Sequence, residues 1–201
     1  MAVLTKFGVP AGTSSETLMP KLQYRFRVLF QDIGGPNNGD ELLVLTRQVI
    51  SVSRPSLTHD EMQLDVYNSR IFLAGKHTWD PITVTFRDDV SSAVIKRIDD
   101  QLQRQINHAT QSAATSGSQY KFQMRIETLD GSDTPGVLDF WTLEGCYISN
   151  VQYGESNYAT SDQQQVVLTI RYDNAQHGSG ETNFLATTPN RDGSVDLATD
   201  Q

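Results

Sequence analysis

Cysteine, charge and long apolar runs are all scarce in this sequence. Its 201 residues include a single cysteine, Cys146, which excludes an internal disulfide framework and a cysteine-built zinc site. The longest apolar runs have three or four residues, as at 42–45, whereas a membrane-spanning helix needs about 20. The first 20 residues lack a charged region followed by an apolar core, so we expect no secretory signal peptide.

Positive charge is also in short supply. The chain has 16 Lys and Arg against 24 Asp and Glu, a formal net charge of −8. This acidic balance argues against a basic footprint on nucleic acid, although it is compatible with a protein that lets nucleic acid pass without holding it. Charged residues make up 20% and hydrophobic residues 37%, which excludes a coiled coil and wholesale disorder. The length suits one domain with its own core.

Alternation of apolar and polar residues is the main pattern that is present. In 120–127, for example, Tyr120, Phe122, Met124 and Ile126 alternate with polar residues. A period of two places one set of side chains on a core and the other on a polar surface. Four segments follow this pattern and predict antiparallel strands. They are 22–30, 81–87, 120–127 and 166–172.

Three further segments are predicted to be strands. They are the apolar stretch 42–52, the stretch 62–72, and the long stretch 138–153. In the last of these the alternation changes phase around Gly145, which predicts a bulge or a bend there.

One segment, about 89–107, has helical periodicity. Its apolar residues recur every four positions, so we expect an amphipathic helix whose stripe packs on a sheet. The stripe consists of Val90, Val94, Ile98, Leu102 and Ile106. Asp88 or Asp89 is expected to cap its first turn. The predicted fold is therefore mainly β, an antiparallel barrel or sandwich of two packed sheets with one flanking helix.

The two ends differ in composition from the middle. Residues 1–20 are small and polar and are interpreted as an N-terminal arm, while 21–175 is the β-barrel domain. Residues 176–201 are interpreted as a flexible acidic tail; from residue 173 onward the net charge is −4. The main turns are expected at 34–40, 130–136 and 154–162.

The sequence contains no motif typical of a catalytic, phosphate-binding or metal-binding site. We therefore predict a protein that is not an enzyme and has no catalytic, cofactor-binding or metal-binding residues. Cys146 is expected to be a buried, inert thiol. The residues around Asp130 lack the spaced acids of a calcium loop and are interpreted as a turn. None of the histidines has a ligand spacing, and all are expected to have surface or turn roles. They are His59, His77, His108 and His177.

Several motifs, in a specific order, resemble the tail tube proteins of contractile-tailed bacteriophages. The pattern is a Trp-x-Pro-Ile strand, an Arg-Asp-Asp helix entry, a Trp-x-Leu-x-Gly strand, a Tyr-Ala-Thr-Ser-Asp turn and a final strand ending Arg-Tyr-Asp-Asn. These motifs lie within 65–70, 74–89, 141–148, 157–162 and 166–175. The resemblance covers about 21–175, and Hcp-like secretion tube proteins share the fold of this family.

The resemblance implies a structural virion protein. Six copies would form a ring, rings would stack into the inner tube of a tail, and one sheet of each copy would line the conduit for genome ejection. The implied partners are further copies, the tail sheath protein, a tape measure protein in the lumen, and the baseplate tube initiator and tail terminator. Phage DNA would be met only in passage, membrane binding is not expected, and the subunits would assemble in the host cytoplasm.

Two other interpretations remain open. A baseplate tube initiator or a secretion-system tube protein would share the fold. A carbohydrate-binding β-barrel module belongs to a different class, and it is disfavoured because the aromatic residues lie on the apolar phase of their strands.

The lumen of such a tube is expected to be neutral or acidic, because a basic lumen would bind the phosphates of passing DNA. We therefore expect Arg25, Arg27 and Lys121 to pair with acids or to lie in subunit contacts.

Overall fold

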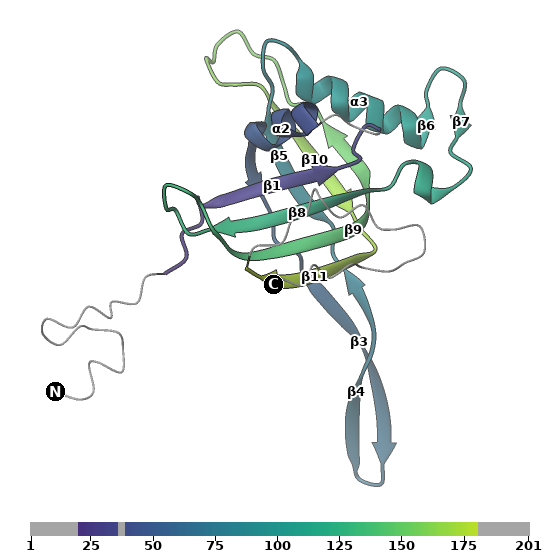
Figure 1. Ribbon diagram of the computed structural model, residues 1–201. Coiled ribbons are helices and arrows are strands. Elements are labelled where there is room, and N and C mark those ends of the chain that lie inside the picture. Colours follow the sequence, from purple (N-terminus) through teal and green to yellow (C-terminus); the bar gives the residue numbers. More distant parts are fainter. Residues whose placement is uncertain (1–19, 36–38, 181–201) are drawn as a thin grey trace, which may run out of the picture.

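Two antiparallel sheets pack face to face and share one long strand (Figure 1). The computed structural model describes residues 20–35 and 39–180. Its elements, in chain order, are β1 (Phe26–Gln31), α2 (Gly39–Gln48), β2 (Val49–Val52), β3 (Leu57–Val66), β4 (Ser69–Trp79), β5 (Ile82–Arg87), α3 (Ala93–Gln105), β6 (Ile106–Asn107), β7 (Ser112–Ala113), the 3-10 turn η1 (Gly117–Gln119), β8 (Phe122–Leu129), β9 (Val137–Gln152), β10 (Gln165–Arg171) and β11 (Asn174–Ser179).

The shared strand, β9, bends at Gly145. Before the bend β9 pairs with β8 and β11, and after it β9 pairs with β10. One sheet therefore has the order β1-β8-β9-β11 and the other the order β9-β10-β5-β2. Gly145 has φ 66°, in the left-handed region that glycine adopts most easily. The bend predicted from the sequence is confirmed.

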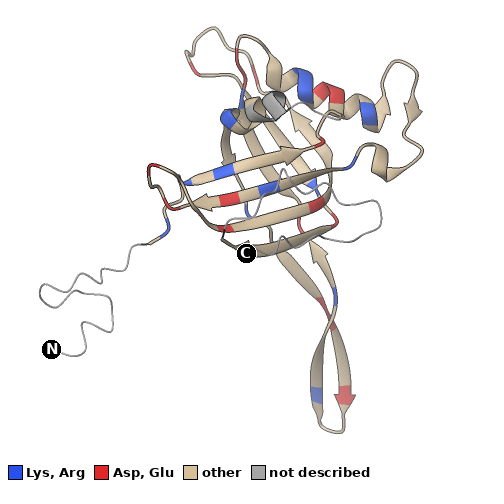
Figure 2. Ribbon diagram, in the orientation of Figure 1, with Lys and Arg blue, Asp and Glu red and all other residues tan. Residues whose placement is uncertain are grey.

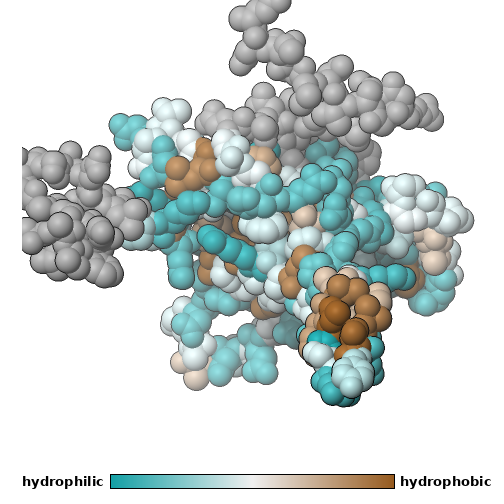
Figure 3. All heavy atoms as spheres, turned by 90° about the horizontal axis from the view of Figure 1, so that it is seen from below, coloured by the Kyte–Doolittle hydropathy of each residue, from teal (hydrophilic) through white to brown (hydrophobic). Residues whose placement is uncertain are grey.

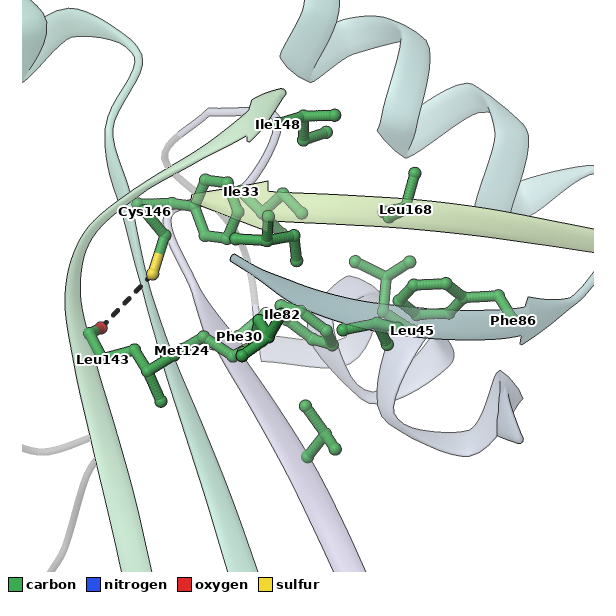
Figure 4. Packing of buried hydrophobic residues seen from close by; sticks show 14 of the residues in the cluster. Phe30, Ile33, Leu45, Ile82, Phe86, Met124, Leu143, Cys146, Ile148 and Leu168 are labelled. Atoms are coloured by element: carbon green, nitrogen blue, oxygen red, sulfur yellow. Dashed lines mark hydrogen bonds between the residues drawn. The ribbon is translucent and has the colours of Figure 1, made fainter. Parts of the chain in front are cut away.

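Alternating residues of both sheets fill the space between them. Phe30 of β1 and Phe86 of β5 lie with their ring centroids 5.8 Å apart, and Met124, Leu143 and Leu168 are fully buried around them (Figure 4). The mainly β, two-sheet fold is confirmed. It is a sandwich and not a closed barrel, because within the described part of the chain β1 pairs only with β8 and β2 only with β5.

The helix α3 covers one end of the sandwich. Val94 and Ile98 are buried, and Leu102 packs against the core. Gln101 is also buried; its Nε2 donates to the Tyr120 carbonyl over 2.5 Å and its Oε1 accepts from the Gly34 amide over 2.9 Å. These hydrogen bonds attach the helix to the loop after β1 and to the segment before β8, two neighbouring strands of one sheet.

The predicted helix boundaries were wrong at both ends. The chain makes a turn from Asp89 to Ser92 before α3 begins, and Ser92 has φ 52°. Val90 is consequently fully exposed, and Ile106 lies half-exposed in β6 after the helix has ended. Asp89 does act at the helix start, because its Oδ1 accepts from the Ala93 amide over 3.3 Å.

Two of the predicted strands also have a different structure. The segment 42–52 is mostly the helix α2, which places Leu45 in the core, and only its last four residues form β2. A short apolar run has no periodicity that separates a strand from a buried helix. The segment 62–72 is two strands, because the chain reverses at Tyr67, which has φ 51°.

Ordered structure continues beyond the predicted domain boundary. The strand β11 pairs with β9 as far as Ser179, which lies past the boundary at 175 predicted from the sequence; the division into arm, domain and tail stays a prediction. At the other end, 22–25 form a turn before β1, in which the Arg25 amide donates to the Leu22 carbonyl. The arm at 1–19, most of the tail and part of the 34–40 loop lie outside the described residues.

Candidate assembly surface

A hairpin of two long strands, β3 and β4, projects from the sandwich (Figure 1). It continues the β2–β5 pairing: the Ser53 amide donates to the Thr83 carbonyl and the Asp80 amide to the Ser56 carbonyl, both over 3.0 Å. All ten residues of β3 are exposed. At about 3.3 Å per residue, the hairpin extends roughly 30 Å beyond the body of the protein.

The two faces of this hairpin differ in polarity. Met62 lies opposite Leu73 and Leu64 opposite Ile71, so these side chains share one face, together with Val66. On the other face Asp65 lies opposite Arg70, and their side chains form an ion pair of 2.9 Å; the one large apolar side chain on that face of the paired residues from Glu61 to Ala74 is Phe72, opposite Gln63. Figure 3 shows apolar residues gathered on the hairpin.

An uncovered apolar face on a projecting hairpin requires a partner. The exposed large apolar residues between β3 and β4 are Leu57, Met62, Leu64, Val66, Tyr67, Ile71, Phe72 and Leu73. An isolated two-stranded hairpin is marginally stable in water, and contiguous exposed apolar surface marks interaction sites. The hairpin is therefore the strongest candidate for an intermolecular contact in the described structure.

A row of aromatic rings connects the hairpin to the sandwich. His59 and His77 face each other across the hairpin, 6.0 Å between ring centroids, and His77 packs edge-on against Trp79 at 6.3 Å. Trp79 contacts Trp141 of β9, which in turn contacts His177 at 4.9 Å. The row gives the stem of the hairpin a defined orientation.

The histidines thus lie closer together than the sequence indicated. The spacing along the chain gave no second histidine near His59, but antiparallel pairing of β3 with β4 supplies His77. His108 instead contacts Gln103, 3.1 Å between Nδ1 and Nε2. In the described ranges, no cluster of three or more His, Cys, Asp or Glu residues is placed to hold a metal ion. The absence of catalytic and metal-binding residues stays a prediction.

The three basic residues singled out from the sequence all have partners within the chain. Arg27 pairs with Glu127, 2.6 Å from Nη2 to Oε2, and Lys121 pairs with Asp173, so the expected pairing with acids is confirmed for these two. Arg25 donates to the Asp130 carbonyl. Figure 2 shows basic residues on β1 and residues of both signs on the neighbouring strand β8.

A buried ion pair on the outer face of the same sheet could not be expected from the alternation of residues in this strand. Arg125 and Glu127 of β8 are both almost completely buried, with 3.1 Å between Nε and Oε1. The Arg125 guanidinium also lies 3.7 Å from the centroid of the Phe140 ring. Alternation placed both residues on a polar face, and contacts with the neighbouring strands surround them: Phe140 of β9 lies against Arg125, and Arg27 of β1 pairs with Glu127.

Cys146 and Asp130 have the surroundings expected for structural residues. Cys146 is buried, its Sγ donates to the Leu143 carbonyl over 3.5 Å (Figure 4), and burial raises the pKa of the thiol well above its usual range. Asp130 Oδ1 accepts from the Ser132 amide and hydroxyl, both over 2.9 Å, and from the Gly136 amide over 3.1 Å. These hydrogen bonds lower the pKa of Asp130. They hold the residues from Asp130 to Gly136 in a turn, as expected from the sequence.

A second surface lies where the two sheets fail to close. Between the free edges of β1 and β2, a groove of about 780 Å³ opens toward solvent. We call it the seam groove; it is lined by Lys21, Gln23, Tyr24, Phe26, Ile50, Ser51, Val52, Arg54, Ile126 and Thr128.

Within the described ranges, no helix is long and apolar enough to cross a membrane.

The fold is shared with solved components of contractile injection systems, in agreement with the resemblance found in the sequence. A chain of the anti-feeding prophage baseplate matches with TM-score 0.59 and 18% identity over 81% of this chain and 97% of that one. A chain of an extracellular contractile injection system, the PVC sheath–tube complex in its extended state, matches with TM-score 0.61 and 16% identity, covering 84% and 99%. The anti-feeding prophage tube-terminating cap matches with TM-score 0.61 and 14% identity, covering 89% and 99%. No protein-family model and no curated protein matches the sequence.

Proposed function

We propose that this protein is the repeating subunit of the inner tube of a contractile phage tail, in which hexameric rings stack to form the conduit for genome ejection. The observation that carries the proposal is the projecting hairpin, whose apolar face has no partner in the described part of its own chain. A surface of this kind suits repeated association of identical copies. Head-to-tail contacts between copies close into rings or extend into filaments.

The similar structures support a tube assembly. They are components of contractile systems, and the baseplate among them was symmetrised six-fold. By analogy, the partners of this chain are further copies, a sheath, a tube terminator and a baseplate tube initiator. We extend the proposal to a tape measure protein and to passing DNA in the lumen, and to a place in the virion.

A tube initiator is the second candidate function. The match to a baseplate chain supports it as much as the sheath–tube match supports the repeating subunit. The two functions differ in copy number: a repeating subunit forms long tubes by itself, whereas an initiator stops at one ring. A secretion-system tube protein would also form tubes, but without DNA in the lumen. A carbohydrate-binding role has less support, since Trp79, Trp141 and Tyr172 pack on one another.

Electron microscopy of the purified chain tests the proposal. We expect rings with six-fold symmetry that stack, as concentration rises, into tubes with a central channel. The variant Leu64→Asp places a charge on the apolar face of the hairpin and should abolish stacking. Gln63→Asp, one residue away on the polar face, is its matched control and should assemble normally. A wild-type chain that sediments as a monomer at every concentration contradicts the proposal.

A further inference from the structure

Two histidines face each other at the stem of the hairpin. His59 of β3 lies directly opposite His77 of β4, with 6.0 Å between the ring centroids. Residues that are directly opposite in an antiparallel pair project from the same face, with their Cβ atoms roughly 4.5–5.5 Å apart. Both side chains are exposed, so an ion in solvent can reach the two imidazole rings.

The separation of the rings suits one shared metal ion. A zinc–nitrogen bond is about 2.0 Å long and the imidazole centre lies about 1.2 Å behind the nitrogen, so each centroid would lie about 3.2 Å from the ion. Two such rings are at most about 6.4 Å apart, and about 5.2 Å apart at a tetrahedral angle. The observed 6.0 Å lies within this limit, so rotation of the side chains is enough to bring both rings onto one ion.

One of the two rings is already oriented by its neighbours. His77 packs edge-on against Trp79, with 6.3 Å between ring centroids, and Trp79 contacts Trp141 of the sandwich. A ligand group that is held in place before binding loses less conformational freedom when the ion arrives.

The strand pairing next to the histidines is irregular. The register of β3 on β4 shifts between His59 and Glu61, and a Cβ on Gly75 would lie only 2.9 Å from the carbonyl oxygen of Asp60. A two-stranded hairpin is marginally stable in water. An ion that joins His59 to His77 would therefore connect the strands beside the point where their own pairing is interrupted.

Charge and accessibility favour a cation on this face. Alternation along β3 places Glu61 on the same face as His59, and its carboxylate adds a negative charge beside the pair. The apolar residues Met62 and Leu64 have the opposite phase on β3. The histidine pair thus lies on the polar face of the hairpin, away from the apolar face.

We propose that His59 and His77 bind one divalent transition-metal ion that prefers imidazole ligands, of which Zn²⁺ is the representative, and that the ion links β3 to β4. Zn²⁺ accepts nitrogen ligands without a strong geometric preference. Water completes the coordination, because no group of three His, Cys, Asp or Glu residues is in place within the described ranges.

This site departs from the sequence-based prediction of a chain without metal-binding residues. That prediction used spacing along the chain, whereas the pair exists only once β3 and β4 have paired. The proposal does not depend on the tube function, so each can fail without the other.

Calorimetric titration of the chelator-treated chain with Zn²⁺ tests the site. We expect one ion per chain and binding at least about tenfold weaker in His59→Asn and in His77→Asn, since loss of even an outer-shell partner of a metal site costs roughly 10–100-fold. His108→Asn and His177→Asn are matched controls and should bind as the wild type does. No saturable binding, or a loss as large in either control, would overturn the proposal.

A rescue variant separates loss of a ligand from loss of structure. A cysteine thiolate is also a zinc ligand, so His77→Cys should retain binding that His77→Asn loses. Circular dichroism of both variants checks that the exposed substitutions leave the fold unchanged. If the two variants bind Zn²⁺ equally weakly, His77 is not a ligand.

Amide hydrogen exchange tests whether the ion links the two strands. With free Zn²⁺ at about ten times its dissociation constant, exchange in 57–61 and 74–79 should slow by about tenfold, because the ion binds only the closed stem. Exchange in α3 is the internal control and should not change. Zn²⁺ that binds without slowing exchange on both strands would contradict the link between β3 and β4.

Discussion

The indole of Trp79, the last residue of β4, meets the indole of Trp141 on β9 edge to face, with 6.5 Å between ring centroids. Trp79 also lies 5.8 Å from the ring of Tyr172. Because β4 belongs to the hairpin and β9 to both sheets, this contact joins the projecting element to the sandwich. The orientation of the hairpin thus depends on packing at its base.

Removing Trp79 should loosen the base of the hairpin and destabilise the protein. We expect Trp79→Ala to lower the free energy of unfolding by about 3 kcal/mol, as for other packed aromatic residues, measured by urea denaturation of the unassembled chain. Tyr67→Ala, at the exposed tip of the hairpin, is the control and should change it by less than about 0.5 kcal/mol. Equal effects would show that Trp79 is not a packing residue.

Ile98 of α3 and Val90 of the turn before it offer a pair of substitutions that sequence periodicity alone would treat as equivalent, because both lie on the predicted apolar stripe. Ile98 is completely buried and Val90 is fully exposed. Ile98→Ala should therefore cost about 2–5 kcal/mol of stability, whereas Val90→Ala should be within about 0.5 kcal/mol of the wild type. Thermal and urea unfolding of both variants measure the difference. A large loss in Val90→Ala would contradict the observed start of the helix.

The bend of β9 depends on a glycine. A Cβ on Gly145 would lie 2.3 Å from Asp173 Oδ2, and the backbone is in the left-handed region. Gly145→Ala should cost about 1–3 kcal/mol through backbone strain and should also disturb the Lys121–Asp173 ion pair.

Gly117→Ala is the matched control for this glycine. A Cβ there would lie 3.6 Å from the nearest atom, in the flexible Lys121 side chain. We expect urea denaturation to show little change for it. A neutral Gly145→Ala would mean that the bend does not require glycine.

The turn after β8 should open at acidic pH. Hydrogen bonds from the Ser132 amide and hydroxyl lower the pKa of Asp130 below the ordinary value of an aspartate. A carboxyl group with a lowered pKa stabilises the fold above the pKa of its unfolded form and stops doing so as the pH falls through the folded pKa. Amide hydrogen exchange at Ser132 and Gly136 should therefore remain slow well above pH 3.8 and lose its protection only at lower pH.

A variant provides the control for this pH dependence. Asp130→Ala removes the acceptor, so the Ser132 and Gly136 amides should exchange rapidly at every pH. If the wild type and the variant exchange equally fast at neutral pH, the hydrogen bonds to Asp130 do not hold this turn.

The mainly β architecture of two packed sheets could be predicted from the order of residues alone. The alternating residues Phe122, Met124 and Ile126, and likewise Val166, Leu168 and Ile170, are the ones that fill the core. The phase change at Gly145 likewise marked the bend of β9. These features could be predicted because strand periodicity is local: each side chain points to the opposite face from its neighbour whatever the remainder of the chain does.

The features on which the candidate assembly surface depends arise from the three-dimensional arrangement of the strands and could not be predicted from local pattern. The apolar residues at 62–73 alternate like those of a core strand, but β3 and β4 extend beyond the sandwich, where nothing in the described chain covers them. Pairing of β3 with β4 brought His59 to His77. Arg125 and Glu127 of β8 are buried, and the Arg125 guanidinium lies over the Phe140 ring of β9. The gap between β1 and β2 has the same origin, because whether two edge strands pair depends on the curvature and closure of whole sheets and not on the residues of either strand.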